Sequence, residues 1–182
     1  MNMFATIYPA ADRHFALWKN GGGETAEIVA DPPGAGFDNF GWRVSTARVT
    51  KSGPFSIFPG VTRCLTVLSG GTLMLRFPSG DSALLDSEAA PLVFPGDLHC
   101  DCALSGEAVL DLNVMTRAPY SAAVSRGTPR ATDLPEGAIA FVFALRDLPE
   151  LGLVRHDLAR LADHAAAPAL DDADAIFIAI SG

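Results

Sequence analysis

Residues 41–70 constrain the fold more than any other part of this sequence. They read GWRVSTARVTKSGPFSIFPGVTRCLTVLSG, two extended segments joined by turn-forming residues at 51–54. Because strand side chains alternate between two faces, Arg43 and Ser45 share a face of the first segment, and Arg63 lies among apolar neighbours in the second. A guanidinium is rarely buried without a partner. Two arginines that point into a barrel would clamp a carboxylate, whereas outward-pointing arginines would be ordinary surface residues.

Short extended runs recur along the chain and are separated by turn signals. The 17 glycines and 13 prolines are typical of many short strands joined by tight turns. The other extended runs lie at 4–7, 25–30, 72–77, 83–85, 91–94, 108–115, 137–145 and 175–180. The run 137–145 is continuously apolar, as in a strand buried on both faces. Steady spacing of such runs predicts an all-β barrel or sandwich.

Two segments depart from this pattern. Residues 157–164 place Leu158 and Leu161 at helical spacing, and Asp157 can serve as an N-cap, so we expect a short helix there. Residues 116–136 are rich in Arg, Ser, Thr and Pro and are expected to form a connector.

Length and charge narrow the function classes. A chain of 182 residues forms one good-sized domain or two small barrels that share a core. The net charge of -8 argues against a nucleic-acid surface, which needs a basic stripe. From residue 131 onward the sequence has nine acidic residues and three basic ones. The positive groups therefore concentrate earlier in the chain, where an anionic ligand remains compatible with the charge.

Targeting and cysteine patterns indicate a cytoplasmic protein. The opening residues have no basic start followed by a long apolar run, and no apolar run is long enough to span a bilayer. The three cysteines, Cys64, Cys100 and Cys102, are odd in number and do not form a disulfide framework. We therefore expect a reducing, cytoplasmic setting and no membrane association.

The sequence offers few metal ligands. A catalytic divalent site usually needs three protein ligands, and no H-x-H pair occurs here. Cys100 and Cys102 would share one strand face, with His99 on the other. We expect no metal and no other cofactor, and we expect His99 to face solvent or to be hydrogen-bonded.

Catalytic patterns are equally sparse. There is no G-x-S-x-G elbow, and Ser45 has no evident histidine partner. A paired-carboxylate mechanism would need Asp111 to converge with Glu27 or Glu24. We expect a binding protein rather than an enzyme.

A set of polar residues on otherwise apolar strands forms the candidate site. It comprises Arg43, Ser45, Arg63, Asp111 and Asn113. If they line an interior, Asp111 can hold one arginine while the other receives a small carboxylate, which a planar guanidinium meets bidentately. Asn113 and Ser45 would orient the ligand through neutral hydrogen bonds. The alternative is that Asp111 and Arg63 neutralise each other as a structural pair.

Two further side chains complete the expected site. Trp18 and Met115 can provide an apolar wall of the kind that small-molecule pockets have. Trp18 precedes three consecutive glycines, which permit positive φ and close backbone approach, but the ending of a phosphate-binding loop is absent. We expect a glycine-rich turn that leads into a strand.

Four separated motifs resemble the HutD/Ves family. They are WKNGGGET-x-EI at 18–28, WR-x-S-x-A at 42–47, GPFS-x-FPG-x-x-R at 53–63 and DLNVM at 111–115. The resemblance covers roughly residues 18–117 and is looser in the C-terminal third. It implies a bicupin, in which one chain folds into two packed cupin-like β-barrels with few short helices. Residues 1–120 would form the barrel with the motifs, and residues 121–182 would complete the second.

The resemblance also implies a regulatory role in histidine utilisation, with urocanate or N-formylglutamate as the suspected kind of ligand. We expect a metal-independent, cytoplasmic binding protein for such a carboxylate. A metal-free cupin enzyme that acts on a histidine-degradation intermediate through Asp111 or His99 remains an alternative, as does an interaction protein with a vestigial pocket. The ligand, the oligomeric state and any protein partner are left open.

Overall fold

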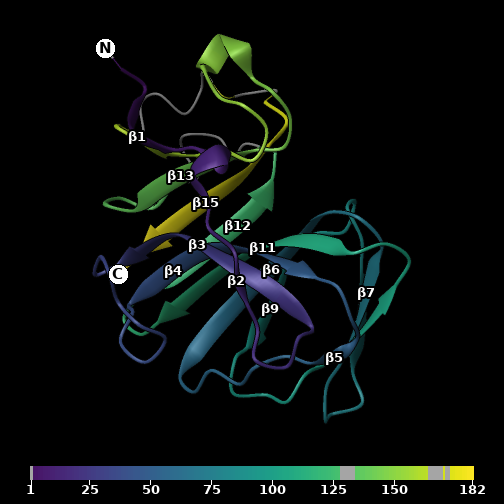
Figure 1. Cartoon of the computed structure of the whole chain (residues 1–182). Coiled ribbons are helices and arrows are strands. Elements are labelled where there is room, and N and C mark those ends of the chain that lie inside the picture. Colours follow the sequence, from purple (N-terminus) through teal and green to yellow (C-terminus); the bar gives the residue numbers. More distant parts are fainter. Residues whose placement is uncertain (1, 128–133, 164–169, 171–172) are drawn as a thin grey trace. The chain divides into compact units, whose positions relative to one another are not determined.

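The computed structural model describes residues 2–127, 134–163, 170 and 173–182, and these residues form β-strands with almost no helix (Figure 1). The described residues include the short 3-10 helices η1 (Ala10–Asp12) and η3 (Pro149–Leu151). The prediction of an all-β fold with few short helices is therefore confirmed. Two compact units make up the chain: His14–Pro119, and Met1–Arg13 together with Tyr120–Gly182.

The unit His14–Pro119 contains two antiparallel sheets. The larger sheet has the strand order β2-β3-β4-β11-β6-β9. Its strands are β2 (Ala16–Leu17), β3 (Gly23–Asp31), β4 (Trp42–Val49), β11 (Val109–Arg117), β6 (Val61–Ser69) and β9 (Leu92–Pro95). The smaller sheet has the order β5-β10-β7-β8, formed by β5 (Gly53–Pro54), β10 (Asp101–Ser105), β7 (Thr72–Arg76) and β8 (Ser82–Leu85).

An apolar core joins the two sheets of this unit. The larger sheet contributes Leu65 and Val67, and the smaller sheet contributes Leu73 and Leu75; all four are at most 1% exposed. Burying such side chains is the main favourable term in holding two sheets together. The face of the larger sheet that carries Leu65 and Val67 is therefore an interior face.

The other unit is a single antiparallel sheet with the order β1-β14-β13-β15-β12. Its strands are β1 (Phe4–Tyr8), β14 (Leu158–Leu161), β13 (Ile139–Ala144), β15 (Ala175–Ser181) and β12 (Ser121–Arg126). The chain's first strand thus pairs with β14, far away in sequence. The apolar run predicted as a doubly buried strand is β13, which is buried from Ala140 to Ala144.

The helix expected at 157–164 is wrong. Leu158–Leu161 is strand β14, which pairs with β1 on one side and with β13 on the other. Hydrogen bonds to the two neighbouring strands satisfy the backbone N–H and C=O groups of this segment, and Leu158 and Leu161 are buried. These contributions outweigh the weak helix propensity of a few residues. Asp157 still caps a turn, since its carboxylate accepts from the backbone N–H of Ala10 at 2.7 Å and of Val154 at 3.0 Å. Residue 164 lies outside the described residues.

The connector expected at 116–136 is wrong at its start. Strand β11 continues to Arg117, and Ser121–Arg126 forms β12 against β15. Pairing along the buried strand β15 holds this segment in the sheet, although its alanine and serine residues have low strand propensity. Residues 128–133 lie outside the described part of the chain.

Candidate functional site

Cross-strand register brings the predicted polar residues to one face. Strand β11 lies between β4 and β6, and Met115 is paired with Arg43 on one side and Arg63 on the other. Asn113 is paired with Ser45 in the next row of the same face. Residues directly opposite each other point to the same side of a sheet. Side chains from three strands therefore gather on one surface.

That surface is the interior face of the larger sheet, and it is buried. Asp111 follows in the third row, opposite Val67 of the core. The exposed fractions are 6% for Arg43, 1% for Ser45, 7% for Arg63, 1% for Asp111, 6% for Asn113 and 2% for Met115. Such burial of charged groups requires compensating contacts, so the partners of the two arginines decide what the face can bind.

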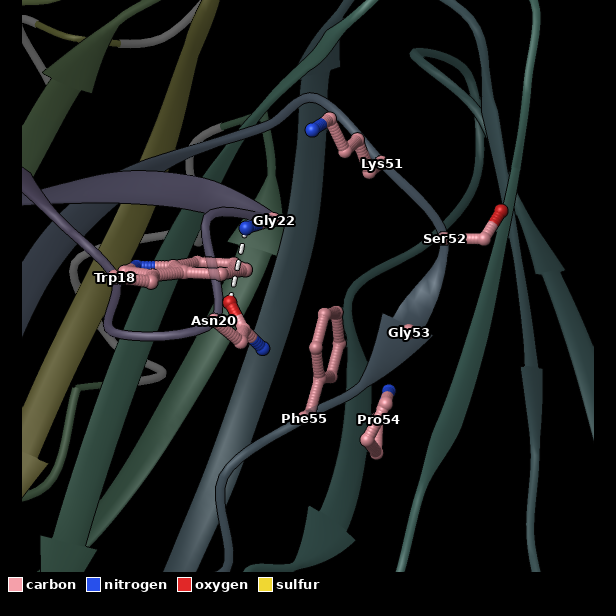
Figure 2. A pocket seen from close by; sticks show the side chains of 8 residues that line it. All are labelled: Trp18, Asn20, Gly22, Lys51, Ser52, Gly53, Pro54 and Phe55. Atoms are coloured by element: carbon pink, nitrogen blue, oxygen red, sulfur yellow. Dashed lines mark hydrogen bonds between the residues drawn. The ribbon is translucent and has the colours of Figure 1, made fainter.

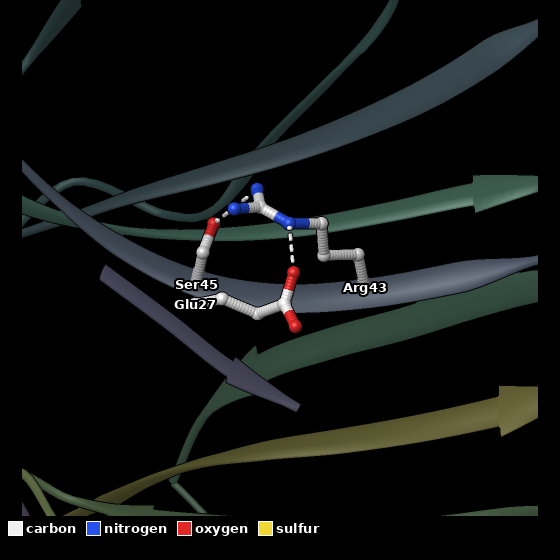
Figure 3. Close-up of polar contacts among 3 residues, drawn as sticks. All are labelled: Glu27, Arg43 and Ser45. Carbon is white, nitrogen blue, oxygen red and sulfur yellow. Dashed lines mark hydrogen bonds and ion pairs between the residues drawn. The ribbon is translucent and has the colours of Figure 1, made fainter. Parts of the chain in front are cut away.

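Arg43 is held by a carboxylate. Its Nε donates to Glu27 Oε2 at 2.9 Å, and its Nη1 donates to Ser45 Oγ at 3.1 Å (Figure 3). The ring of Phe37 lies 4.9 Å from its guanidinium carbon. The Glu27 side chain is 39% exposed, so this ion pair reaches solvent.

Arg63 is held without a direct carboxylate partner among the described residues. Its Nη2 donates to Asn113 Oδ1 at 3.0 Å, its Nη1 makes a long contact of 3.5 Å to Ser56 O, and its buried Nε has no acceptor. Three aromatic rings surround the guanidinium carbon, Phe55 at 5.2 Å, Phe58 at 5.4 Å and Phe94 at 5.1 Å. Burial lowers the pKa of Arg63, and Asp111 opposes that shift.

Asn113 connects Arg63 to Asp111. Its Nδ2 donates to Asp111 Oδ1 at 2.5 Å while its Oδ1 accepts from Arg63. Burial raises the pKa of Asp111 to about 7, against the opposing effects of Arg63 and of the Asn113 hydrogen bond. The predicted pair of Arg63 and Asp111 is therefore an indirect one, with an amide between the two charges.

The two predicted wall residues lie in different places. Met115 sits between the two arginines and packs in a cluster with Phe40 and Val61. Trp18 does not join that row; its ring meets Phe55 edge-on at 6.4 Å, and its Nε1 donates to Thr25 Oγ1 at 2.7 Å. Phe55 therefore contacts both Trp18 and Arg63.

Trp18 instead borders a separate hollow of ≈ 160 Å³ (Figure 2). Its lining comprises Trp18, Asn20, Gly22, Lys51, Ser52, Gly53, Pro54 and Phe55. The glycine-rich turn expected before a strand is confirmed, since β3 begins at Gly23.

His99 lies outside this polar network, whereas Cys100 and Cys102 lie near it: burial raises the pKa of Cys100 against the lowering effect of Arg63, and Asp111 adds to the effect of burial on Cys102. His99 Nε2 contacts Asp101 Oδ1 at 3.1 Å on the surface, as expected for a hydrogen-bonded, solvent-facing histidine. Burial raises the pKa of Cys64 to about 11 and that of Cys102 to about 12. Within the described residues, no group of three His, Cys, Asp or Glu side chains could hold a metal ion, and no helix is long and apolar enough to cross a membrane.

Sequence reasoning missed several neighbours of the arginines. For Glu27, strand alternation with Thr25 indicates a defined face, but no local pattern indicates its pairing with Arg43 rather than with Asp111. Phe55 and Phe58 lie inside the motif GPFS-x-FPG, which was a usable signal. Phe37 comes from a loop, and no local pattern identified it.

The assembled face is suited to anion binding. It offers a desolvated cation with unused N–H donors, a neutral amide, and aromatic and thioether surfaces. Each of these is a common element of small-molecule sites.

Comparison with known proteins gives a consistent result. The model of the family described as HutD matches residues 10–179. The chain is 39% identical to protein Ves of Citrobacter koseri over 131 residues, which are 70% of this chain and 67% of Ves. It is 43% identical over 99 residues to an uncharacterized 21.2 kDa protein in the hutC 3' region of Pseudomonas putida, covering 54% of this chain and half of that relative.

Two solved structures share the fold over nearly the whole chain. HutD from Pseudomonas fluorescens SBW25, determined in a formate condition, superposes with a TM-score of 0.79 at 28% identity over 97% of both chains. A conserved protein of unknown function from Pseudomonas aeruginosa PAO1 gives 0.73 at 27% identity, again over 97% of both chains. The resemblance that the four motifs carry is thereby confirmed.

Proposed function

This chain belongs to the HutD family, and on that premise we propose that it is a metal-independent binding protein for a small carboxylate. The carboxylate is bound by Arg63 on the interior face of the larger sheet. The proposal concerns binding without turnover.

The observation that carries the proposal is the incomplete pairing of Arg63. A guanidinium has five N–H donors, and the described residues supply two acceptors, of which one is 3.5 Å away. The Nε atom is buried with no acceptor at all. An unsatisfied buried donor is costly, and a bound carboxylate would supply the missing acceptors in bidentate geometry.

The neighbours of Arg63 support a small and partly apolar ligand. Asn113 already accepts from Arg63 and is oriented by Asp111, so its position is set before any ligand arrives. Met115 and the three phenylalanine rings give the surroundings of the Arg63 guanidinium an apolar character. Arg43 and Ser45 lie on β4, across β11 from Arg63, and add a second polar edge to the same surface.

The relatives support a biological setting for the proposal. One of them is named for its position in the hutC 3' region of Pseudomonas putida. This supports a regulatory role in histidine utilisation, with urocanate or N-formylglutamate as ligand and with sequestration or contact with another protein as the output. The setting we propose is cytoplasmic, without nucleic acid or membrane.

A bicupin architecture is part of the proposal. One barrel would comprise most of residues 1–120 and the other would be completed by residues 121–182. The pairing of β1 with β14 means that the first strand would be contributed to the second barrel.

A metal-free enzyme is the second candidate, and one observation favours it. A carboxyl whose pKa burial raises to about 7 is suited to general acid–base chemistry near neutral pH, and Asp111 meets that criterion. His99 does not support this candidate, because it pairs with Asp101 on the surface.

A thermal-shift panel tests the proposal. Formate, acetate, urocanate and N-formylglutamate are the carboxylates, and neutral imidazole is the control compound. A ligand at one hundred times its dissociation constant stabilises the fold by about 2.7 kcal/mol. We expect a carboxylate of the panel to raise the melting temperature and imidazole to leave it unchanged.

Two arginine substitutions make the result specific. Arg63→Lys keeps the charge but loses the planar fork, so the shift should disappear. Arg48→Lys is the matched control, because Arg48 pairs with Glu24 at the surface and should keep the full shift. A shift that persists in Arg63→Lys would remove Arg63 from the site. A product detected by mass spectrometry and lost in Asp111→Asn would establish the enzyme instead.

A further inference from the structure

The hollow beside Trp18 is not used by the carboxylate site. Phe55 borders both places, because its ring contacts both Trp18 and the Arg63 guanidinium, whereas Arg63 does not line the hollow. Figure 2 shows it between the turn that carries Trp18 and Asn20 and the segment from Lys51 to Phe55. Both segments belong to the unit His14–Pro119.

Backbone hydrogen bonds hold the two walls of the hollow together. The N–H groups of Thr50 and Lys51 both donate to Gly22 O, at 2.9 and 3.2 Å. The Gly22 N–H donates to Asn20 Oδ1 at 2.9 Å, which orients the Asn20 amide (Figure 2). The walls are therefore formed before a ligand binds, which lowers the entropic cost of binding.

The Trp18 ring is fixed in place. Its Nε1 donates to Thr25 Oγ1, and it packs over Gly23, where a Cβ would lie 2.9 Å from the ring and 2.5 Å from Arg48 O. Its plane is turned 88° from that of Phe55. The two rings thus form a rigid aromatic corner, a surface suited to a planar ligand.

A cation lies at the rim of this corner. Lys51 lines the hollow and is exposed, and within the described residues it forms no ion pair. The Asn20 Oδ1 atom is occupied by Gly22, which leaves the Asn20 Nδ2 donors for a ligand. Positive charge and amide donors beside an aromatic corner are complementary to an anion with a flat apolar body.

We propose that the hollow is a second binding site, for a small planar aromatic carboxylate. The ring of the ligand packs into the Trp18–Phe55 corner, and its carboxylate accepts hydrogen bonds from Lys51 and Asn20. A volume of ≈ 160 Å³ accommodates a single six-membered ring with its carboxylate. This site is separate from the one at Arg63, and either can exist without the other.

Benzoate is the probe, and intrinsic fluorescence is the readout. The chain has two tryptophans; Trp42 is 4% exposed, so contact with benzoate reports on Trp18. We expect saturable quenching by benzoate. Cyclohexanecarboxylate has the same charge without the flat ring, and benzyl alcohol has the ring without the charge; both should bind at least about fivefold more weakly. Trp18→Phe should abolish the signal.

Variants at the hollow and at Arg63 separate this site from the carboxylate site. Lys51→Met should weaken benzoate about fivefold and leave any thermal shift by formate unchanged. Lys19→Met is the matched control, since Lys19 is exposed on the same turn but does not line the hollow. Arg63→Lys should leave benzoate quenching intact. Phe55 is not substituted because it contacts both sites.

Several results would overturn the second site. Quenching that rises linearly with benzoate concentration indicates collision rather than binding. Equal affinities in Lys51→Met and Lys19→Met remove the cation from the site. Loss of quenching in Arg63→Lys places benzoate at Arg63 instead of in the hollow.

Discussion

Two buried arginines flank Met115 on the same sheet face, and their surroundings differ. Arg43 has a direct carboxylate partner, Glu27, whose side chain is 39% exposed. Arg63 has an amide partner, three aromatic rings and a carboxylate that is reached only through Asn113. The two residues are nearly equally buried, at 6% and 7% exposure.

The difference shows that burial alone does not make an arginine a binding group. The charge of Arg43 is already balanced by the carboxylate of Glu27, which remains partly hydrated. The charge of Arg63 is balanced mainly by Asp111, a carboxyl whose own ionisation is disfavoured by burial. A ligand anion gains more at Arg63, because there it replaces unmet hydrogen bonds rather than existing ones.

The largest expected effect concerns pH and Asp111. Burial raises its pKa from 3.8 to about 7, so the folded protein keeps a proton that the unfolded chain releases. Relative to Asp111→Asn, the free energy of unfolding should be greatest below about pH 4 and should fall by up to ~4 kcal/mol as the pH rises through about 7. Urea denaturation of both proteins across this range measures the difference. A difference that does not change with pH would show that Asp111 ionises normally.

The second prediction is the loss of the Arg63 charge. Arg63→Met leaves Asp111 buried without its nearby cation, and the expected cost is about 3 kcal/mol at a pH above 7, where the carboxyl is ionised. At about pH 5 the cost should be smaller, because Asp111 is then neutral. Urea denaturation at the two pH values provides the measurement. An equal cost at both would mean that the two residues are not coupled.

Arg43→Met should be less damaging. Glu27 can return to water when its partner is removed, so we expect a cost of about 1 kcal/mol. The same denaturation assay applies, with Arg63→Met as the reference. If Arg43→Met costs as much as Arg63→Met, the contrast between the two arginines is wrong.

The smallest expected effect is that of Ser45→Ala. It removes one acceptor of Arg43 but leaves the Glu27 ion pair, so a cost of about 0.5 kcal/mol is expected. Asn113→Ala serves as the comparison, because Asn113 contacts both Arg63 and Asp111 and its removal should cost more. Denaturation midpoints rank the two variants, and the reverse ranking would contradict the comparison.

Much of the fold could be predicted from the sequence, because strands have a local signal. The alternation of Arg43 with Val44 and the apolar run of β13 depend only on neighbouring residues. The strand at Leu158–Leu161 could not be predicted, because its stability comes from pairing with β1 and β13. Nothing local in the sequence indicates that Trp18 contacts Phe55 rather than joining the row of the two arginines.

By itself, the sequence determined which side chains share a face, since the period of two along a strand is set by the backbone. Asp111, Asn113 and Met115 therefore had to lie together in any strand pairing. Only the tertiary structure decided which arginine is neutralised. The pairing of β3 with β4 places Glu27 opposite Ser45, and the shift after Glu27 leaves Ala30 rather than Val29 opposite Arg43. Glu27 thereby reaches Arg43. Register depends on contacts between segments that are distant in sequence. The partner of each arginine is therefore decided by the tertiary structure, whereas the face on which each side chain lies is decided by the local sequence.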